Sequence, residues 1–319
     1  MVGIKHPTNG NLVSKLPHIL VLVGPTASGK TAMALSIAEK IPSEIISADS
    51  RQIFKHLTIG TAKPSKTELK QVPHHFIDLL EPDQKFNAGD FQEQGRKTIS
   101  QILERKKLPI VVGGTGLYVQ AIVDGFFEQP EISGEVRKLL EDRLEHEGKD
   151  ALYKELQSID PESALTMDST KFRRVIRALE IFHETGTPIS QFHKQHKVNT
   201  MYDAHFFGLN WERSVLYERI NKRVDKMFAE GFLNEVKQLK ESGFDDRFQS
   251  LQTVGYKEAF AYLRSEISKE RMIELMKQNT RRFAKRQMTW FRKEERIHWF
   301  DISSEDQIEQ IAKKIINQL

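Results

Sequence analysis

The chain has 319 residues, enough for one large domain or two ordinary ones, and its net charge of +4 is modest. It contains no cysteine, which excludes disulfides, thiolate catalysis and cysteine-ligated zinc sites. It has no run of roughly 20 apolar residues to cross a membrane, and its first sixteen residues lack the apolar core of a signal peptide. We therefore expect a cytoplasmic protein that has no membrane partner and acts as a monomer.

Short apolar runs bounded by turn residues recur along the chain and predict buried strands. The predicted strands are Ile19–Val23, Glu44–Ser47, Phe76–Leu79, Ile110–Val112, Phe206–Leu209 and Ile297–Phe300. Helical stretches separate these runs, and this alternation indicates a parallel sheet flanked by helices, the α/β fold class.

The pattern changes between Val112 and Phe206, where amphipathic helices occur without a convincing strand. The predicted helices there are Glu135–Glu147, Ala151–Gln157 and Thr170–Glu184. We interpret residues 125–200 as an all-helical insertion domain between two strands of the core. Residues 1–124 would then form the first part of the core, and residues 201–319 its second part.

Residues 24–31 match the phosphate-binding pattern G-x-x-x-x-G-K-[ST]. They follow a predicted strand and precede the helical run Ala32–Lys40, which is typical of P-loop NTPase-like proteins. The backbone amides of such a loop surround a phosphate, Lys30 adds a mobile positive charge, and the Thr31 hydroxyl can bind Mg²⁺. The residues expected at the phosphates are Gly24, Pro25, Thr26, Ala27, Ser28, Gly29, Lys30 and Thr31.

The loop alone does not identify its ligand, which could be ATP. A kinase or hydrolase of this type needs an acidic residue at the end of a later strand to organise Mg²⁺. The strand Ile110–Val112 is followed instead by the glycine-rich run Gly113–Gly116. Asp78 is a candidate substitute, although a carboxylate at a strand end is often only a helix cap. A kinase of a small metabolite or nucleotide therefore stays an alternative.

Further motifs follow the phosphate loop in order along the chain. They are Ser47–Phe54, Gly60–Pro64, Pro73–His75, Gly113–Tyr118, Arg173, Arg177–Glu180, Leu216–Asp225, Gly255–Glu258 and Thr280–Gln287. With the loop, this ordered set resembles the tRNA dimethylallyltransferase (tRNA isopentenyltransferase) family from about residue 18 to residue 300. One departure is Phe54, which stands where the family usually has tyrosine.

The resemblance implies transfer of a dimethylallyl group from dimethylallyl diphosphate to N6 of the adenine on the 3′ side of the tRNA anticodon. Diphosphate is released, and the loop would hold this leaving group with Mg²⁺ as cofactor. Asp49 would be the base that removes the N6 proton, although local sequence alone also fits a turn or helix-cap aspartate. Thr115 would place the attacking nitrogen. Ser50 and Gln52 would bond the adenine edge, although all three could be turn residues.

Two arginines four residues apart, Arg219 and Arg223, share one helix face. Spacing alone favours a solvated face paired with Glu218 or Asp225. The resemblance implies instead that the two arginines bind the diphosphate, and it favours Arg219 as the contact. The residues implied to be catalytic are Lys30, Thr31, Asp49, Thr115 and Arg219. His74 and His75 have no metal-ligand spacing to further partners, so we interpret them as structural hydrogen-bonding residues.

Positive charge is concentrated near the C-terminal end, between Lys277 and Arg296. At 100° per residue, six cations fall within an arc of about 140° that contains no acidic residue. They are Arg281, Arg282, Lys285, Arg286, Arg292 and Lys293. The apolar residues predicted on the opposite side are Phe283, Ala284, Met288, Trp290 and Phe291. A solvated face is the alternative, but such a stripe favours binding to an RNA backbone.

Arg173, Arg174 and Arg177 form a second basic cluster, in the predicted insertion. Two basic surfaces near one catalytic centre would suit the anticodon stem-loop of tRNA, whose target adenine must be flipped out of its stack. The expected tRNA contacts are Asp49, Ser50, Arg51, Gln52, Thr115, Arg173, Arg174, Arg177, Gln252, Arg281, Arg282, Lys285 and Arg286. Two further alternatives are an isopentenyltransferase that accepts AMP and an RNA-binding module with a degenerate site.

Overall fold

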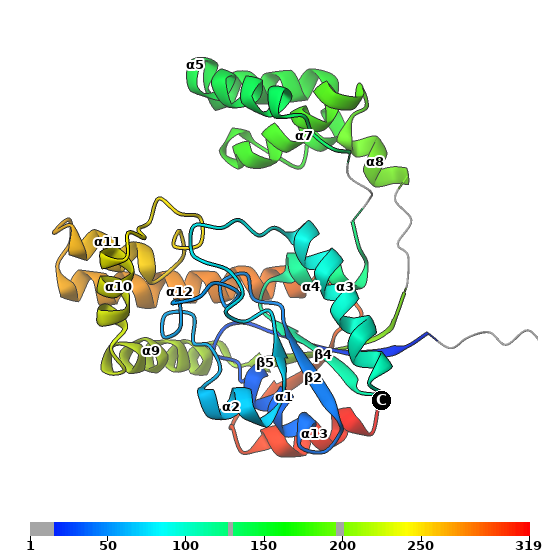
Figure 1. Ribbon diagram of the computed structural model, residues 1–319, viewed down its shortest axis with the longest axis vertical. Coiled ribbons are helices and arrows are strands. Elements are labelled where there is room, and N and C mark those ends of the chain that lie inside the picture. The colour runs from blue at the N-terminus through cyan, green and yellow to red at the C-terminus, as the bar shows by residue number, and fades with distance from the viewer. Residues whose placement is uncertain (1–15, 127–129, 196–200) are drawn as a thin grey trace, which may run out of the picture. The chain divides into compact units, whose positions relative to one another are not determined.

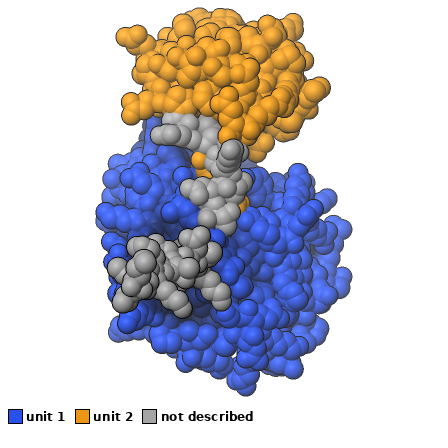
Figure 2. All heavy atoms as spheres, turned by 90° about the vertical axis from the view of Figure 1, so that its right-hand side faces the viewer, with its two compact units in different colours: residues 1–123, 200–319 blue, residues 124–199 orange. Residues whose placement is uncertain are grey.

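The computed structural model describes residues 16–126, 130–195 and 201–319. The first fifteen residues, where we expect no signal peptide, lie outside this range. The chain divides into two compact units, one of residues 1–123 and 200–319 and the other of residues 124–199 (Figure 2). Among the described helices, none combines the length and the apolar character needed to cross a membrane.

The first unit contains a six-stranded sheet in the order β3-β2-β4-β1-β5-β6, with all neighbouring strands parallel (Figure 1). The strands are β1 (His18–Val23), β2 (Ser43–Ser47), β3 (His74–His75), β4 (Leu108–Gly113), β5 (Asp203–Trp211) and β6 (His298–Ile302). Five of them match the predicted apolar runs, and the α/β fold class is confirmed.

The prediction of a strand at Phe76–Leu79 is wrong, because the third strand is only His74–His75. Phe76 and Asp78 have φ angles of 65° and 54°, a left-handed backbone that a strand ladder does not accept. The Phe76 side chain is nonetheless buried, with its ring 5.0 Å from that of Phe91. The apolar run therefore marks a bend that buries Phe76 and leaves Leu79 51% exposed.

The sheet is buried on both faces, because successive residues of each strand point to opposite sides. Leu20 and Leu22 of β1 pack in one core with α1 (Lys30–Ala38) and α13 (Gln307–Ile316). Ile19, Val21 and Val23 pack in the other core with α3 (Ala88–Glu104) and α4 (Gly116–Val123). Full burial of an apolar side chain of this kind contributes about 1.5–3 kcal/mol to the stability of the fold. The two cores therefore hold β1 from both faces of the sheet.

The remaining helices of the first unit form a group beside the carboxyl ends of the strands (Figure 1). They are α9 (Arg213–Ala229), α10 (Phe232–Glu241), α11 (Tyr256–Leu263) and α12 (Lys269–Phe291), and the short α2 (Lys66–Gln71) precedes β3. Phe232 and Tyr256 are fully buried, and their rings pack edge to face at 5.4 Å.

The second unit has its own apolar core, which includes Leu140, Leu152 and Leu179. Its helices are α5 (Gly134–Ile159), α6 (Pro161–Ala164), the 3-10 turn η1 (Ser169–Lys171), α7 (Phe172–Thr185) and α8 (Ile189–Gln195). The first two predicted helices form one element, α5, which is interrupted at Gly148 by a φ of 80° and a ψ of 169°.

A buried carboxylate, Glu44, lies near the amino end of β2, away from the strand ends that carry the phosphate loop. Arg105 donates two hydrogen bonds to it, of 3.0 and 2.7 Å, and Lys107 donates one of 3.0 Å. His75 Nε2 lies 2.7 Å from the same carboxylate, and His74 Nδ1 lies 2.8 Å from the Val72 carbonyl. Both histidines therefore have the structural hydrogen bonds that we expected.

We expect Glu44→Gln to lower the free energy of unfolding by about 3 kcal/mol at pH 7. Burial alone would raise the pKa of Glu44, but the hydrogen bonds from Arg105, His75 and Lys107 outweigh it and lower the pKa to about 2. Because the folded pKa lies below the ordinary value of 4.5, the stabilisation is complete above about pH 4.5 and disappears as the pH falls toward 2.

Urea unfolding of wild type and Glu44→Gln at pH 7 and pH 3 measures this difference. The difference in the free energy of unfolding between the two proteins should be smaller at pH 3 than at pH 7. An equal difference at both pH values would show that the ionisation of Glu44 does not stabilise the fold.

Candidate active site at the carboxyl ends of the strands

The phosphate loop connects the end of β1 to the start of α1, as the sequence pattern predicts. Lys30 is the first residue of α1, and its Nζ donates to the carbonyl oxygens of Gly24 at 2.9 Å and Pro25 at 2.7 Å. Burial and, to a smaller extent, the positive charge of Arg223 lower the pKa of Lys30 to about 7, and the negative charge of Asp49 opposes both. A phosphate group beside Lys30 would favour the charged form of this amine.

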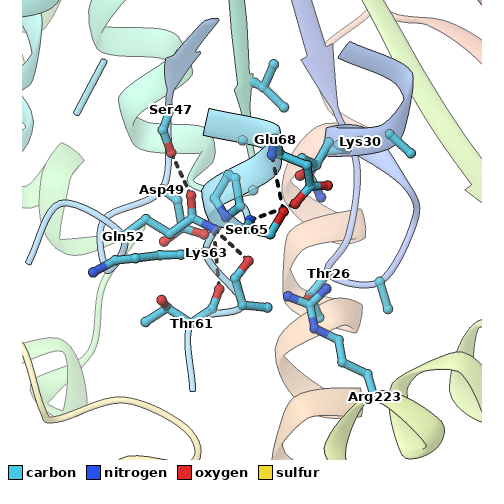
Figure 3. Close-up of a pocket in the computed structure, with 18 of the residues that line it drawn as sticks. Thr26, Lys30, Ser47, Asp49, Gln52, Thr61, Lys63, Ser65, Glu68 and Arg223 are labelled. Atoms are coloured by element: carbon cyan, nitrogen blue, oxygen red, sulfur yellow. Dashed lines mark hydrogen bonds between the residues drawn. The ribbon is translucent and has the colours of Figure 1, made fainter. Parts of the chain in front are cut away.

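A cavity of about 890 Å³ opens at the loop. Residues 26–31 of the loop line it, together with Asp49 and Gln52 from the segment after β2 (Figure 3). Its polar lining also includes Lys63, Asp78, Arg219 and Arg223. Apolar side chains complete the wall, among them Ile59, Met227 and Phe283. The cavity thus combines a cradle for an anion with an apolar surface.

Asp49 has two structural roles in this arrangement. One carboxylate oxygen accepts the backbone N–H of Arg51 at 2.9 Å, which closes a local turn. The same side chain lines the cavity that contains the phosphate loop. The turn role and the role as a base are therefore compatible.

Thr115 lies beside Asp49, because the segments that follow β2 and β4 are hydrogen-bonded to each other. Its backbone N–H donates to the Ala48 carbonyl at 3.2 Å, and its hydroxyl accepts the backbone N–H of Ser50 at 3.2 Å. Asp49, Ser50 and Thr115 are thus brought together, as the sequence predicts.

The Gln52 amide is held by the protein. Its oxygen accepts from the Ser47 hydroxyl at 3.0 Å, and its nitrogen donates to the carbonyls of Thr61 and Ala62, each at 3.3 Å.

Glu235 of α10 holds the start of the segment that contains Thr61 and Ala62. It accepts the backbone N–H groups of residues 58–60 at 2.7–3.1 Å and the Tyr256 hydroxyl at 2.7 Å. The sequence analysis did not predict this role, because Glu235 looks like an ordinary charged residue of an amphipathic helix.

Arg219 and Arg223 of α9 differ in the contacts that their guanidinium groups make. The Nε of Arg219 donates to the Ala27 carbonyl at 2.9 Å, and its guanidinium group pairs with Glu305 at 2.6 Å. That group also lies 4.1 Å from the centre of the Trp211 ring, so Arg219 supports the backbone of the loop. Arg223 extends toward the phosphate loop (Figure 3), and burial lowers its pKa while Asp49 raises it. Of the pair, Arg223 is the more directly placed for an anion in the cavity.

Asp78, the candidate strand-end acid, lines the cavity but forms an ion pair with the buried amine of Lys63. Lys63 also donates to the Phe54 carbonyl. These contacts make Asp78 part of the cavity wall. Strand β4 ends at Gly113, as the sequence indicates.

Gln287 of α12 links the phosphate loop to the glycine-rich segment after β4, and sequence reasoning missed it. Its side-chain oxygen accepts the Thr26 N–H at 2.9 Å, and its nitrogen donates to the Gly114 carbonyl at 3.0 Å. A Cβ atom on Gly114 would lie 2.1 Å from the Gln287 nitrogen, and one on Gly116 would lie 2.1 Å from Trp290. These positions therefore require glycine.

The buried stripe of α12 is narrower than predicted. It contains Ala284, Gln287 and Phe291, whereas Phe283 and Trp290 are 37% and 40% exposed, so their predicted place on the buried side is wrong. Both lie at the edge of the stripe, since they are 60–100° away from its centre at 100° per residue. A polar residue in the middle of a buried stripe was the available signal for Gln287.

The predicted cations near α12 are only partly presented to solvent. Lys285, Arg282 and Arg286 are exposed. Arg281 is half-buried and donates to the Asn221 side chain at 2.6 Å. The helix ends at Phe291, and Arg292 is its C-cap, with a helical backbone and an N–H that donates to the Met288 carbonyl at 2.9 Å. Arg292 and Lys293 are both exposed.

The other expected tRNA contacts have these environments. Arg173 and Arg174 are exposed on α7 in the second unit, as is Phe172. Arg177 pairs with the buried Glu180 at 2.9 Å. In the first unit, Arg51 donates to the Gln249 carbonyl at 2.8 Å, and Gln252 donates to the Arg247 carbonyl at 3.5 Å.

The fold and the site define a class of protein, the α/β proteins with a phosphate loop and a carboxylate in the same cavity. The chain belongs to the IPP transferase family, whose model matches residues 52–294. The tRNA dimethylallyltransferase of Carboxydothermus hydrogenoformans is 44% identical over 302 residues, which cover 94% of this chain and 96% of the relative. That of Bacillus subtilis is 43% identical with the same coverage.

Two solved structures are also similar. The tRNA isopentenylpyrophosphate transferase of Bacillus halodurans has 40% sequence identity and a TM-score of 0.70, over 95% of this chain and 97% of that one. A eukaryotic dimethylallyltransferase acting on tRNA has 29% identity and a TM-score of 0.82, over 93% of this chain and 77% of that one.

Proposed function

We propose that this protein transfers the dimethylallyl group of dimethylallyl diphosphate to N6 of the adenine on the 3′ side of the anticodon in tRNA. The observation that carries the proposal is a single cavity lined by both the phosphate loop and Asp49. The relatives described above are tRNA dimethylallyltransferases. Prenylation of tRNA is the activity that fits both the site and the family.

In the reaction, N6 of adenine attacks the allylic carbon, and the bond between that carbon and the diphosphate oxygen breaks. The electron pair leaves on the diphosphate, and the N6 proton passes to the carboxylate of Asp49. An aromatic amine is a poor nucleophile until its proton can leave, which is why a base is needed. Thr115 is proposed to orient the attacking nitrogen, since its hydroxyl lies in the hydrogen-bonded group beside Asp49.

The charge that develops on diphosphate needs donors that are already in place. Loop residues 26–29, the amine of Lys30 and the guanidinium group of Arg223 line the cavity, and we propose that they supply such donors, with Gly24 and Pro25 completing the loop. Arg219 is proposed to act mainly by holding the Ala27 carbonyl and hence the shape of the loop. Diphosphate binding should therefore depend on both arginines for different reasons.

Mg²⁺ fits the oxygen donors of this cavity. The Thr31 hydroxyl and the Asp49 carboxylate both line it, and oxygen ligands supplemented by substrate phosphates are what Mg²⁺ prefers. We propose that Thr31 holds this ion, which would neutralise charge on the diphosphate.

The adenine is proposed to enter beside Ser50 and Thr115 after it is flipped out of the anticodon loop. The Gln52 amide already bonds Ser47 and the segment at Thr61, so its proposed contact with the base requires an additional hydrogen bond from the same group. The backbone of the tRNA is proposed to contact Arg51, Arg173, Arg174, Arg177, Gln252, Arg281, Arg282, Lys285 and Arg286. Of these, Arg173, Arg174, Arg282, Lys285 and Arg286 are exposed.

The protein is proposed to act as a monomer in the cytoplasm. All the residues that line the cavity belong to the first unit of one chain, so its described wall needs no second subunit.

Mass spectrometry of tRNA nucleosides tests the function directly. Unmodified tRNA incubated with the protein, Mg²⁺ and dimethylallyl diphosphate should yield N6-dimethylallyl adenosine next to the anticodon. Treatment with RNase before the reaction should abolish the product, whereas an enzyme that accepts AMP would remain active. Turnover of ATP without any modified nucleoside would instead identify a kinase.

The exposed cations of α12 provide a separate prediction about tRNA binding. Changing Arg282, Lys285 and Arg286 to alanine should raise the Michaelis constant for tRNA far more than that for dimethylallyl diphosphate, because backbone contacts position the RNA. Each lost phosphate contact should also reduce the slope of log affinity against log salt by up to about one unit. The measurement is tRNA affinity at several salt concentrations.

A matched control removes three positive charges elsewhere, by changing Lys40, Lys313 and Lys314 to alanine. These residues lie on or beside α1 and α13. This control should keep the wild-type slope. Coincident slopes for wild type and the α12 variant would mean that the RNA docks elsewhere.

A further inference from the structure

Three side chains with metal-binding atoms converge at the amino ends of β1 and β5, at the opposite end of β1 from the phosphate loop. His18 Nδ1 lies 3.0 Å from His205 Nε2 and 3.1 Å from a carboxylate oxygen of Asp203. That oxygen lies 3.6 Å from His205 Nε2. Among the residues that the structure describes, this is the one group of three or more such side chains with a common centre.

The strands dictate this arrangement. Asp203 and His205 are two residues apart on β5, so both point to the same face of the sheet. In the parallel register His18 is opposite Asp203, and Leu20 is opposite His205. Leu20 and Leu22, further along the same face of β1, are buried in the core with α1 and α13. Donors mounted on paired strands are positioned more precisely than donors on loops.

The distances match those around a tetrahedral ion. With ligand bonds of about 2.0–2.1 Å, two donors of a tetrahedral zinc site lie about 3.3 Å apart. The three observed separations of 3.0, 3.1 and 3.6 Å are close to this value. Two imidazoles and one carboxylate suit Zn²⁺ and similar divalent transition metals, and they leave a fourth position for water.

Hydrogen bonds among the three side chains satisfy their polar atoms less well than a bound cation would. The nitrogen and oxygen atoms form a triangle in which each atom lies within 3.6 Å of the other two. If both imidazole nitrogens carry a proton and donate to Asp203, two N–H groups face each other at 3.0 Å, whereas a cation at the centre contacts all three atoms favourably. The side chains of His18, Asp203 and His205 are 38%, 52% and 23% exposed, so an ion can reach them from solvent.

We propose that His18, Asp203 and His205 form a binding site for a divalent transition metal, with Zn²⁺ as the best chemical match. The site is distinct from the Mg²⁺ position at Thr31, because His18 begins β1 and the phosphate loop follows its last residue, about 16 Å away at roughly 3.3 Å per residue. The ion would link the central strand β1 to β5, so its effect would be on stability.

Zinc binding to the full chain without an affinity tag tests the proposal. The protein is treated with a chelator and titrated with Zn²⁺ against a chromophoric chelator, in the presence of excess Mg²⁺. Mg²⁺ prefers oxygen ligands and should not compete. We expect one equivalent of Zn²⁺ to bind and to raise the unfolding temperature, and Co²⁺ to give the absorption of a tetrahedral site.

The variants His18→Ala and His205→Gln should each weaken Zn²⁺ binding by at least about tenfold, since even indirect partners of a metal contribute 10–100-fold. Glutamine retains a hydrogen-bonding group of similar size, so its loss of Zn²⁺ would separate metal binding from hydrogen bonding. Asp203→Asn provides a third variant if either histidine change prevents folding. The control is His56→Ala, since His56 pairs with only one carboxylate, that of Glu81.

Wild-type affinity for Zn²⁺ in the folded variants would overturn the assignment, as would the absence of stoichiometric binding to wild type. Neither result would affect the proposed transfer reaction, which is measured separately.

Discussion

Replacing Asp49 by asparagine should lower the rate of tRNA prenylation by roughly 10²–10⁴, the range expected when a general base is removed. Asparagine can still accept the Arg51 N–H that closes the local turn, so the fold should be preserved. The affinities for tRNA and for dimethylallyl diphosphate should change little, because the loss concerns proton removal. Single-turnover rates across neutral pH, with circular dichroism to confirm folding, provide the measurement.

Asp78→Asn is the matched comparison for Asp49→Asn. Its carboxylate lines the same cavity but is paired with Lys63, so the change should have the smaller effect on the chemical step. A near wild-type rate for Asp49→Asn would remove Asp49 from the mechanism. An equal loss in both variants would point to the total negative charge of the cavity instead.

Changes in the phosphate loop should also reduce turnover strongly. We expect Lys30→Ala and Thr31→Ala each to lower the turnover rate by a factor of roughly 10²–10³. Lys30 is buried beside the loop carbonyls, and its charge would be directed at the leaving diphosphate. The tRNA affinity should stay nearly unchanged, because the proposed backbone contacts lie on other elements. Binding of each substrate is measured separately from turnover.

Lys40→Ala serves as the control, since Lys40 follows the same helix and pairs only weakly with Glu309 at 3.8 Å. It should retain full activity. Loss of tRNA binding in the Lys30 and Thr31 variants, with normal affinity for the allylic diphosphate, would show that the loop does not hold the diphosphate.

The parts of the site that sequence predicts are those encoded by neighbouring residues. The phosphate loop is one continuous run, and Asp49 immediately follows a strand whose apolar run is easy to recognise. Parallel strands end at the same edge of a sheet, so the sequence also predicts that these residues meet. The resemblance to a family added their chemical roles, which spacing alone left open.

The parts that sequence did not predict depend on contacts between distant segments. Gln287 is 261 residues from Thr26, whose N–H it accepts, and Glu235 is 177 residues from Thr58. The apolar run at Phe76 predicted the burial of Phe76 but not the left-handed backbone there or the exposure of Leu79. Likewise, spacing placed Arg219 and Arg223 on one face. Only the fold shows that both line the cavity and that Arg219 also donates to the backbone of the loop.

The strand order also has a consequence for synthesis on the ribosome. β1 lies between β4 and β5, and β5 begins ninety residues after β4 ends because the helical unit intervenes. At about 5–20 residues per second, one edge of β1 stays without its partner strand for about 5–20 seconds during translation. An unpaired edge is a template for pairing with other chains. The length of the second unit therefore sets how long this edge of the nascent catalytic core is open to pairing with other chains.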